Sequence, residues 1–264
     1  MGDSLTGCDA LVAVVLAAGS GTRLRPLTLL EPKALCPVNG VSLVDLAVER
    51  ARSVTPTVAV NGHHGRDRLR AHLRAAPAAS GAEVHLSVEE PEALGTAGAL
   101  GHLKSWIDGR PVLVLNVDAW HRASMVDFVT GWTGDHTRLL TVANARRGTW
   151  GDRHYAGAAL MPWSEIRRLP DSPSGLWEVA WRRLVPGQDL ELVLHDGVFF
   201  DCGTPADYLA ANLEASGGRS VIGHDATIEG TVESSVVWAG ARVERCEHLL
   251  RAVRATGGVT VMVR

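Results

Sequence analysis

The segment from Leu16 to Val38, LAAGSGTRLRPLTLLEPKALCPV, follows directly on the apolar run 11–15. A short β-branched run that ends in a Gly/Ser/Thr-rich turn is typical of a buried parallel strand, which delivers a loop to the carboxyl edge of a sheet. Open α/β sheets bind their ligands at this edge. The segment therefore predicts an α/β fold with a ligand-binding loop after its first strand.

The same loop has the chemistry of an anion site. Gly19 and Gly21 allow the backbone to approach a ligand closely, and the N–H groups of such a turn can surround an anion. Arg23, Arg25 and Lys33 add positive charge within one short segment. A phosphate-rich ligand is the expected partner.

Composition excludes several other classes of protein. The chain has 264 residues and a formal net charge of −3, with no basic stripe, so no nucleic-acid partner is expected. Its four cysteines lack CxxC spacing, which argues against zinc and against a disulfide framework and favours a reducing, cytoplasmic environment. No apolar run is long enough to span a membrane, and the N-terminus lacks the pattern of a signal peptide.

Apolar runs and helical patterns alternate over the first 217 residues. This alternation predicts a Rossmann-like, mostly parallel sheet with right-handed crossovers, in a first domain of residues 1–217. The expected strands are 11–16, 57–61, 83–88, 112–116, 139–143, 156–161 and 190–194, and the expected helices are 41–53, 63–75, 94–106, 177–184 and 205–215.

The apolar period changes in residues 218–264. Ile222, Ile228, Val237 and Val243 stand at separations of six or multiples of three, with glycines between them. This resembles the hexapeptide repeats of a left-handed parallel β-helix, of which about two coils of about 18 residues fit here. Because repeat stacks usually need about three units to bury a core, we expect the tail to rest on the first domain or on another subunit. The oligomeric state stays open, a homo-oligomer included.

The motif GSGTRLRPLT followed by EPK resembles the signature of the sugar-1-phosphate nucleotidylyltransferases, also called NDP-sugar pyrophosphorylases. Within that family the chain is most similar to mannose-1-phosphate guanylyltransferase-like members. Simpler motifs fit less well, since Leu24 stands where a dinucleotide fingerprint has its third glycine and no Gly-Lys-Ser/Thr occurs. The resemblance covers residues 11–215 and, loosely, the tail, and it implies a catalytic domain over residues 1–217.

In this family a phosphate oxygen of a sugar 1-phosphate attacks the α-phosphorus of a nucleoside triphosphate and expels pyrophosphate. Such a reaction needs cations that align two anions and neutralise developing charge. Asp118, in LNVD, and Asp201, in FFDCGTPADY, match the aspartates that bind Mg²⁺ in the family. Arg23 matches the arginine that clamps the triphosphate, and Lys33 matches the lysine that contacts the phosphates of both substrates. The resemblance thus assigns catalysis to Arg23, Lys33 and Asp118.

Nucleotide recognition is expected from two segments. The backbone of Leu16 to Gly19 would border the ribose and base. The segment SVEEPEALGTAG, residues 87–98, resembles the family's S-x-E-x-x-E-P-L-G-T-A-G element, which does not fix the identity of the base. The expected nucleotide-binding residues are Leu16, Ala17, Ala18, Gly19, Gly21, Thr22, Glu89, Gly95 and Thr96.

The sugar side departs from the family pattern. The Glu-Lys-Pro element of the family is not evident, and Val117 stands where a small residue usually precedes the metal-binding aspartate. The remaining matches assign sugar binding to Asn144, Gly157 and Glu178. We therefore expect a smaller or more open sugar pocket.

The resemblance implies a Mg²⁺-dependent enzyme of nucleotide-sugar biosynthesis, with GTP and mannose 1-phosphate as the first choice of substrates. A uridylyl- or thymidylyltransferase acting on another sugar 1-phosphate is one alternative. A catalytically weak regulatory homologue that binds nucleotide sugar is another. A hexapeptide-repeat acyltransferase is disfavoured because the tail is too short.

Overall fold

The structure is a computed structural model that describes residues 11–75, 83–143 and 149–263. Its contacts group the chain into two compact units that are each discontinuous in sequence. The first comprises Met1–Gly19 and Ala47–Phe199, and the second comprises Ser20–Leu46 and Phe200–Arg264. The domain boundary expected after residue 217 stays a prediction.

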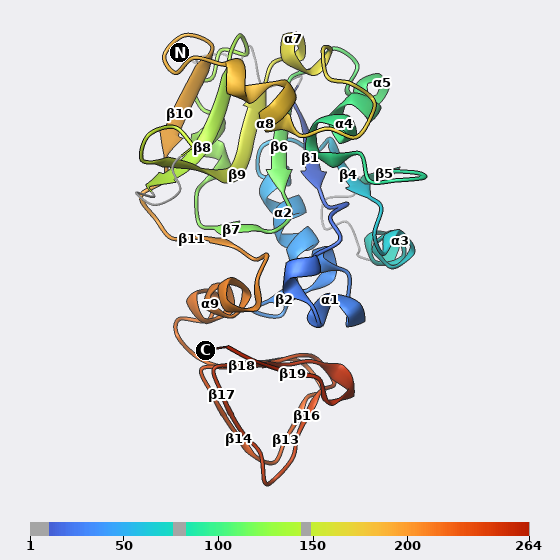
Figure 1. The fold of residues 1–264 in the computed structure, drawn as a ribbon, viewed down its shortest axis with the longest axis vertical. Coiled ribbons are helices and arrows are strands. Elements are labelled where there is room, and N and C mark those ends of the chain that lie inside the picture. Colours follow the sequence, from blue (N-terminus) through green and yellow to red (C-terminus); the bar gives the residue numbers. More distant parts are fainter. Residues whose placement is uncertain (1–10, 76–82, 144–148, 264) are drawn as a thin grey trace, which may run out of the picture. The chain divides into compact units, whose positions relative to one another are not determined.

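The first unit contains a seven-stranded sheet (Figure 1). Six strands run in one direction and β9 alone runs antiparallel, between β8 and β6. The mostly parallel α/β sheet expected from the sequence is confirmed. In spatial order the strands are β10 (Leu190–Leu194), β8 (Thr137–Ala143), β9 (Arg153–Met161), β6 (Val112–Asn116), β1 (Val12–Leu16), β4 (Val58–Gly62) and β5 (His85–Val88).

The central strands are apolar except at their carboxyl ends, because helices and loops cover both of their faces. Val12, Val14, Val112 and Val114 are fully buried in one core cluster, to which Leu100 of the helix α4 also belongs. Continuous burial of this kind explains why these strands read as unbroken apolar runs rather than as alternating patterns. The helices of this unit are α3 (Arg66–Ala75), α4 (Gly95–His102), α5 (Lys104–Ile107), α6 (Met125–Val129), α7 (Trp163–Ile166) and α8 (Leu176–Val179), while α2 (Leu43–Arg52) begins in the second unit.

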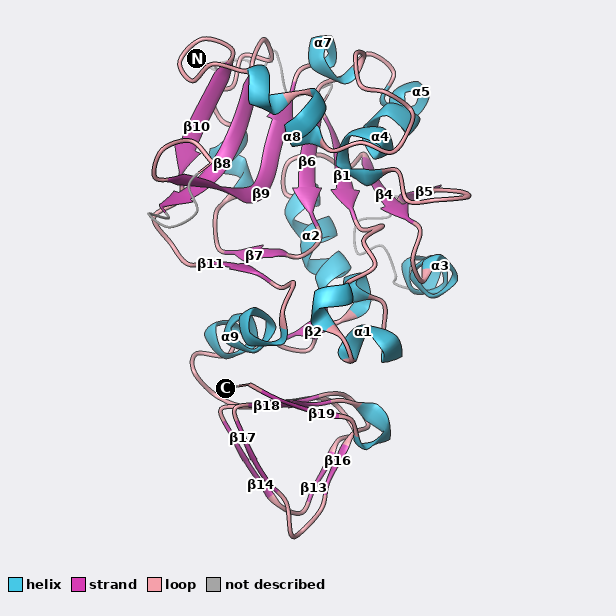
Figure 2. Cartoon of the chain, viewed as in Figure 1, coloured by secondary structure: helices cyan, strands magenta, loops and turns pink. Residues whose placement is uncertain are grey.

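Two helices expected from the sequence are interrupted (Figure 2). The expected helix 94–106 is divided into α4 and α5 at Leu103, and the expected helix 177–184 consists of α8 and a 3-10 turn at Trp181–Arg183. Ala180 separates the last two with a non-helical backbone, φ −124° and ψ −65°. The periodicity of buried side chains continues across both breaks, so the sequence pattern does not reveal them.

The second unit begins with short elements from the glycine-rich loop. These are 3-10 turns at Thr22–Leu24 and Lys33–Leu35, the helix α1 (Leu27–Leu30) and the hairpin β2 (Pro37–Val38) and β3 (Val41–Ser42). After β11 (Phe199–Asp201), the helix α9 (Pro205–Ala215) has Thr204 as its N-cap, whose hydroxyl accepts from the Asp207 N–H.

The tail of the second unit forms short strands on three sides of a triangle (Figure 1). Val221 pairs with Val236, and Val236 pairs with Val253, both in parallel, so successive coils are 15 and 17 residues apart rather than about 18. Val237, Val243 and Leu249 form a small core inside the tail. The strands are β12 (Val221–Ile222), β13 (Thr227–Ile228), β14 (Thr231–Glu233), β15 (Val236–Val237), β16 (Arg242–Val243), β17 (His248–Leu250), β18 (Ala252–Arg254) and the antiparallel β19 (Thr260–Met262).

Within the described ranges, no helix has both the length and the apolar character needed to cross a membrane.

Candidate active site

The carboxyl ends of β1 and β6 lie next to each other in the first unit. The Val117 N–H donates to the Leu16 carbonyl at 3.1 Å, which joins the two strand ends. The expected nucleotide-binding residues Leu16 to Gly19 therefore begin at the same sheet edge as Asp118, which follows β6 in a turn before β7 (Ala119–His121). This is the edge at which open α/β sheets bind ligands.

Asp118 is half-buried and lies close to Tyr155 of β9. Burial, and secondarily the Asp118 carboxylate, raise the pKa of the Tyr155 phenol above its usual value. The Tyr155 hydroxyl is buried and has no hydrogen-bond partner among the described residues. Next to it, the ring of Tyr155 stacks edge-on against Trp181 at 4.9 Å.

Glu89, expected as a polar contact to the base, is fully buried. Its Oε1 accepts from the Asn61 amide at 2.6 Å, and its Oε2 accepts from the Leu94 N–H at 2.7 Å. The side-chain Oδ1 of Asn61 in turn accepts from the Ala17 N–H at 2.5 Å. The Glu89 carboxylate thus joins internal hydrogen bonds between loops.

Gly95 and Thr96 form the first turn of α4, and this helix packs on the segment before α8. The Thr96 hydroxyl accepts from the Leu176 N–H at 2.8 Å, at the start of α8. The Ser174 N–H donates to the Leu94 carbonyl at 2.9 Å, and the Ala97 N–H donates to the Ser174 carbonyl at 3.0 Å. The segment expected to hold the nucleotide is therefore bonded directly to the helix that carries Glu178.

The sugar-side residues occupy different environments. Gly157 is buried in β9, where an added Cβ would lie 2.1 Å from the Ala119 Cβ. Glu178 is exposed on α8, and its side chain turns back over Gly175. A Cβ added at Gly175 would lie 2.0 Å from the Glu178 Oε2. Trp177 and Trp150 are in edge-to-face contact at 5.4 Å. Asn144 lies outside the described residues.

In the second unit, Arg23 and Asp201 form an ion pair. The Arg23 Nη2 and the Asp201 Oδ2 are 3.2 Å apart, and the side chains are 63% and 44% exposed. Such an exposed pair contributes little to stability, so a ligand can displace it at low cost. The second carboxylate oxygen, Asp201 Oδ1, is buried and has no hydrogen-bond partner in the part of the chain that the structure describes.

Gly21, Thr22 and Lys33 belong to the same loop as Arg23. The Thr28 hydroxyl donates to the Gly21 carbonyl at 2.8 Å, which holds the turn against α1. Thr22 is exposed and Lys33 is half-buried. Lys33 is the first residue of the 3-10 turn Lys33–Leu35, and α1 separates this turn from the one that contains Arg23.

The sequence did not single out Asn61, although a polar residue at the end of the buried strand 57–61 is a recognisable signal. His63 and His64, which follow β4, each contact a backbone carbonyl of another loop. The His63 Nδ1–H donates to the Glu89 carbonyl at 2.9 Å, and the His64 Nδ1–H donates to the Ala18 carbonyl at 3.2 Å. Within the described ranges, no cluster of three or more His, Cys, Asp and Glu residues could hold a metal by itself.

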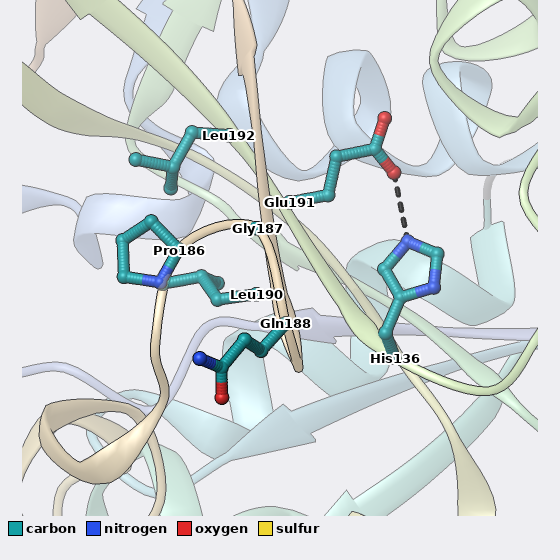
Figure 3. A pocket seen from close by; sticks show the side chains of 7 residues that line it. All are labelled: His136, Pro186, Gly187, Gln188, Leu190, Glu191 and Leu192. Atoms are coloured by element: carbon teal, nitrogen blue, oxygen red, sulfur yellow. Dashed lines mark hydrogen bonds and ion pairs between the residues drawn. The ribbon is translucent and has the colours of Figure 1, made fainter.

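A shallow pocket of about 440 Å³ lies elsewhere in the first unit, beside the edge strand β10 (Figure 3). His136 and Glu191, which both line it, are hydrogen-bonded to each other, with the His136 Nε2 2.8 Å from the Glu191 Oε2. None of the residues that the sequence assigns to nucleotide, metal or sugar binding lines this pocket; its lining consists of His136, Pro186, Gly187, Gln188, Leu190, Glu191 and Leu192.

Comparison with known proteins identifies the class. Residues 12–147 match the family model described as nucleotidyl transferase, and the chain belongs to the sugar-1-phosphate nucleotidylyltransferase family. It is 44% identical over 231 residues to the N-acetylmuramate alpha-1-phosphate uridylyltransferase of Caulobacter vibrioides, in a match that covers 76% of this chain and 95% of the relative.

Two further comparisons, at lower identity, cover more of the chain. The probable mannose-1-phosphate guanylyltransferase 1 of Oryza sativa subsp. japonica is 25% identical over 289 residues, covering 89% of this chain and 80% of the relative. A solved structure from Thermus thermophilus, described as a mannose-1-phosphate geranyltransferase, has a TM-score of 0.67 at 16% identity and covers 96% of this chain and 95% of that one. The structural likeness shows that the fold is that of the nucleotide-diphospho-sugar transferases.

Proposed function

We propose that this protein transfers a uridylyl group from UTP to a sugar 1-phosphate of the N-acetylmuramate type, giving UDP-sugar and pyrophosphate. The observation that carries the proposal is the 44% identity to the Caulobacter uridylyltransferase over 95% of that protein's length. GTP with mannose 1-phosphate is the second candidate. It is favoured by the resemblance of the sequence motifs and by the weaker match to the rice protein, which covers 89% of this chain.

In this reaction an acceptor phosphate oxygen forms a bond to the α-phosphorus of the triphosphate. The bond from the α-phosphorus to the bridging oxygen breaks, and pyrophosphate leaves with the electron pair. The attacking phosphate is already ionised, so alignment and charge neutralisation provide most of the catalysis. Arg23 and Lys33 would contribute fixed positive charge, and the Arg23 ion pair with Asp201 is exposed enough to exchange for a phosphate.

We further propose that Mg²⁺ supports the transfer, with Asp118 and Asp201 as its protein ligands. The buried, unpartnered Oδ1 of Asp201 fits this role, since a desolvated carboxylate oxygen without a hydrogen-bond donor favours a cation. When bound, the ion would neutralise charge on the phosphates. The remaining coordination would come from substrate oxygens and water, as Mg²⁺ typically prefers.

The tail, in this proposal, is a short left-handed β-helix. Its support is the parallel pairing of successive coils and the apolar side chains that face the inside of the tail.

The substrate assignment is tested by a panel of UTP, GTP and dTTP against the 1-phosphates of N-acetylmuramate, N-acetylglucosamine and mannose, with pyrophosphate release as the readout. We expect the highest kcat/KM for UTP with N-acetylmuramate α-1-phosphate. A higher value for GTP with mannose 1-phosphate would establish the second candidate. No turnover with any pair, together with measurable binding of an NDP-sugar, would identify a regulatory homologue.

The metal assignment is tested with Asp201→Asn. Loss of a metal ligand should lower Mg²⁺-dependent kcat by about 10²-fold or more, with little change in the free energy of unfolding because the ion pair is exposed. Glu229→Gln is the matched control, since it disrupts another exposed ion pair of the second unit, with Arg242, and should leave activity unchanged. Near-normal Mg²⁺-dependent activity of Asp201→Asn would refute the assignment.

A further inference from the structure

The two loops expected to hold the nucleotide base follow β1 and β5, and the end of β4 lies between these two strand ends in the first unit. In the sheet register Asn61 of β4 stands beside Leu16 of β1 on one side and beside Ser87 of β5 on the other. The loop after β1 and the loop after β5 are thus the direct neighbours of Asn61.

Asn61 bonds to both loops through opposite ends of its amide group. Its carbonyl accepts from the Ala17 N–H, and its NH₂ group donates to the Glu89 carboxylate. A rotated amide would present hydrogens to the Ala17 N–H and a carbonyl to a carboxylate, so these two partners determine the orientation. Asn61 is 2% exposed and Glu89 is 0% exposed, so water does not compete for the bonds.

The Glu89 carboxylate extends the connection to the start of α4. Its second oxygen accepts from the Leu94 N–H, one residue before the helix-opening Gly95. The result is a continuous chain of hydrogen bonds from Ala17 through Asn61 and Glu89 to Leu94, which we name the loop tie. Burying a carboxylate is costly unless donors satisfy it, and here both oxygens have donors.

The two histidines after β4 reinforce the same arrangement. His63 bonds to the Glu89 carbonyl and His64 to the Ala18 carbonyl, so each contacts one of the two loops. The position of the β1 loop relative to the 89–95 loop is therefore fixed by a network whose central side chains, Asn61 and Glu89, are inaccessible to a base.

We propose that Asn61 and Glu89 are positioning residues for the nucleotide: through the loop tie they set the spacing of the two base-binding loops without touching the base. This inference rests on the proposed nucleotidyl-transfer function. It assigns Glu89 a role different from the direct base contact expected from the sequence. It also predicts that disrupting the tie weakens binding of the nucleoside part of the substrate and leaves polyphosphate binding intact.

The chemistry of the pair allows a reciprocal exchange. Asn61→Asp places a second carboxylate against Glu89. Glu89→Gln replaces one of the two acceptor oxygens with an NH₂ group, which faces either the Asn61 amide or the Leu94 N–H, so one hydrogen bond is lost in either orientation. The double variant Asn61→Asp/Glu89→Gln restores every bond: the new carboxylate at 61 accepts from the Ala17 N–H and from the new amide at 89, whose carbonyl accepts from the Leu94 N–H. Net charge and the number of hydrogen bonds are then those of the wild type.

The experiment measures binding of UTP by calorimetry without an acceptor, and inhibition by tripolyphosphate, which lacks a base. We expect each single variant to weaken UTP binding about tenfold or more, while tripolyphosphate binding and the KM for the sugar 1-phosphate stay unchanged. The double variant should recover most of the UTP affinity. Glu83→Gln, the same change at an exposed carboxylate before β5 and outside the segment 87–98, is the matched control and should bind UTP normally.

Three outcomes would overturn the inference: wild-type UTP binding in both single variants, equal loss of UTP and tripolyphosphate binding, or no recovery in the double variant. If Asn61→Asp does not fold, Glu89→Gln and the double variant carry the same comparison. If the wild type prefers GTP, GTP replaces UTP. A wild type that binds no nucleoside triphosphate would refute the proposed function and this inference with it, whereas nucleotide binding insensitive to the variants refutes the inference alone.

Discussion

His121 is a buried histidine whose surroundings oppose its protonation. It is 6% exposed at the end of β7, and its Nε2 accepts from the Arg50 Nη1 at 3.0 Å. Burial, then the positive charge of Arg50, and then His195 lower the pKa of His121 to about 3. The imidazole is therefore neutral in the folded protein at pH values well above 3.

This lowered pKa makes the folded state sensitive to acid. In the unfolded chain the pKa of a histidine is about 6.5, so between about pH 6.5 and pH 3 the unfolded state binds a proton that the folded state does not. Stability is fully present above about pH 6.5 and should fall by up to about 1.4 kcal/mol per pH unit below it. Urea denaturation at a series of pH values measures this slope. His121→Gln removes the group that takes up this proton, so the slope should decrease by up to about 1.4 kcal/mol per pH unit. An unchanged slope in that variant would contradict the lowered pKa of His121.

At the scale of elements, α4 packs against the segment 170–174 through a stripe of glycines. A Cβ on Gly101 would lie 1.9 Å from the Pro170 carbonyl oxygen, and one on Gly98 would lie 2.4 Å from the Ser172 carbonyl oxygen. Gly98, the last residue of the motif associated with the nucleotide, and Gly101, three residues beyond it, thus allow this helix to contact backbone. Close approach outweighs the helix propensity that alanine would add.

Gly101→Ala tests that balance. Alanine gains about 1 kcal/mol of helix propensity but meets the Pro170 carbonyl, so we expect a net loss of about 1–3 kcal/mol in the free energy of unfolding. The loss is measured by urea denaturation. Ser105→Ala on α5, where the side chain is exposed, is the control and should change stability by less than about 0.5 kcal/mol. If Gly101→Ala were more stable than the wild type, the segment 170–174 would have to move away from α4 at no cost in free energy.

At the scale of the whole chain, Tyr208 joins three distant segments of the second unit. It is fully buried on α9, its hydroxyl donates to the Pro37 carbonyl, and it accepts from the Trp238 Nε1 at 3.1 Å. The tail is thereby bonded to α9 and to the hairpin β2–β3. The second unit is held together by a contact between residues far apart in sequence.

Tyr208→Phe removes this connection. It leaves a buried acceptor at Pro37 and a buried donor on Trp238, so we expect a loss of about 2 kcal/mol in stability, measured by thermal or urea denaturation. Tyr155→Phe is the matched control, because the Tyr155 hydroxyl has no hydrogen-bond partner among the described residues and its removal should cost little. Equal stability losses in the two variants would contradict the role of the hydrogen bonds.

Sequence alone determined the family, the mostly parallel sheet and the position of the glycine-rich loop after β1, because strand burial and phosphate binding leave local patterns of apolar and glycine residues. Only the tertiary structure shows that the Glu89 carboxylate is buried and hydrogen-bonded to Asn61. It also decided the break of the 94–106 helix, the coil lengths of 15 and 17 residues in the tail and the joining of Tyr208 to Trp238. These features depend on which groups contact one another between segments that are distant in the sequence. The periodicity of apolar residues along the chain does not indicate which partner a buried carboxylate or hydroxyl will have.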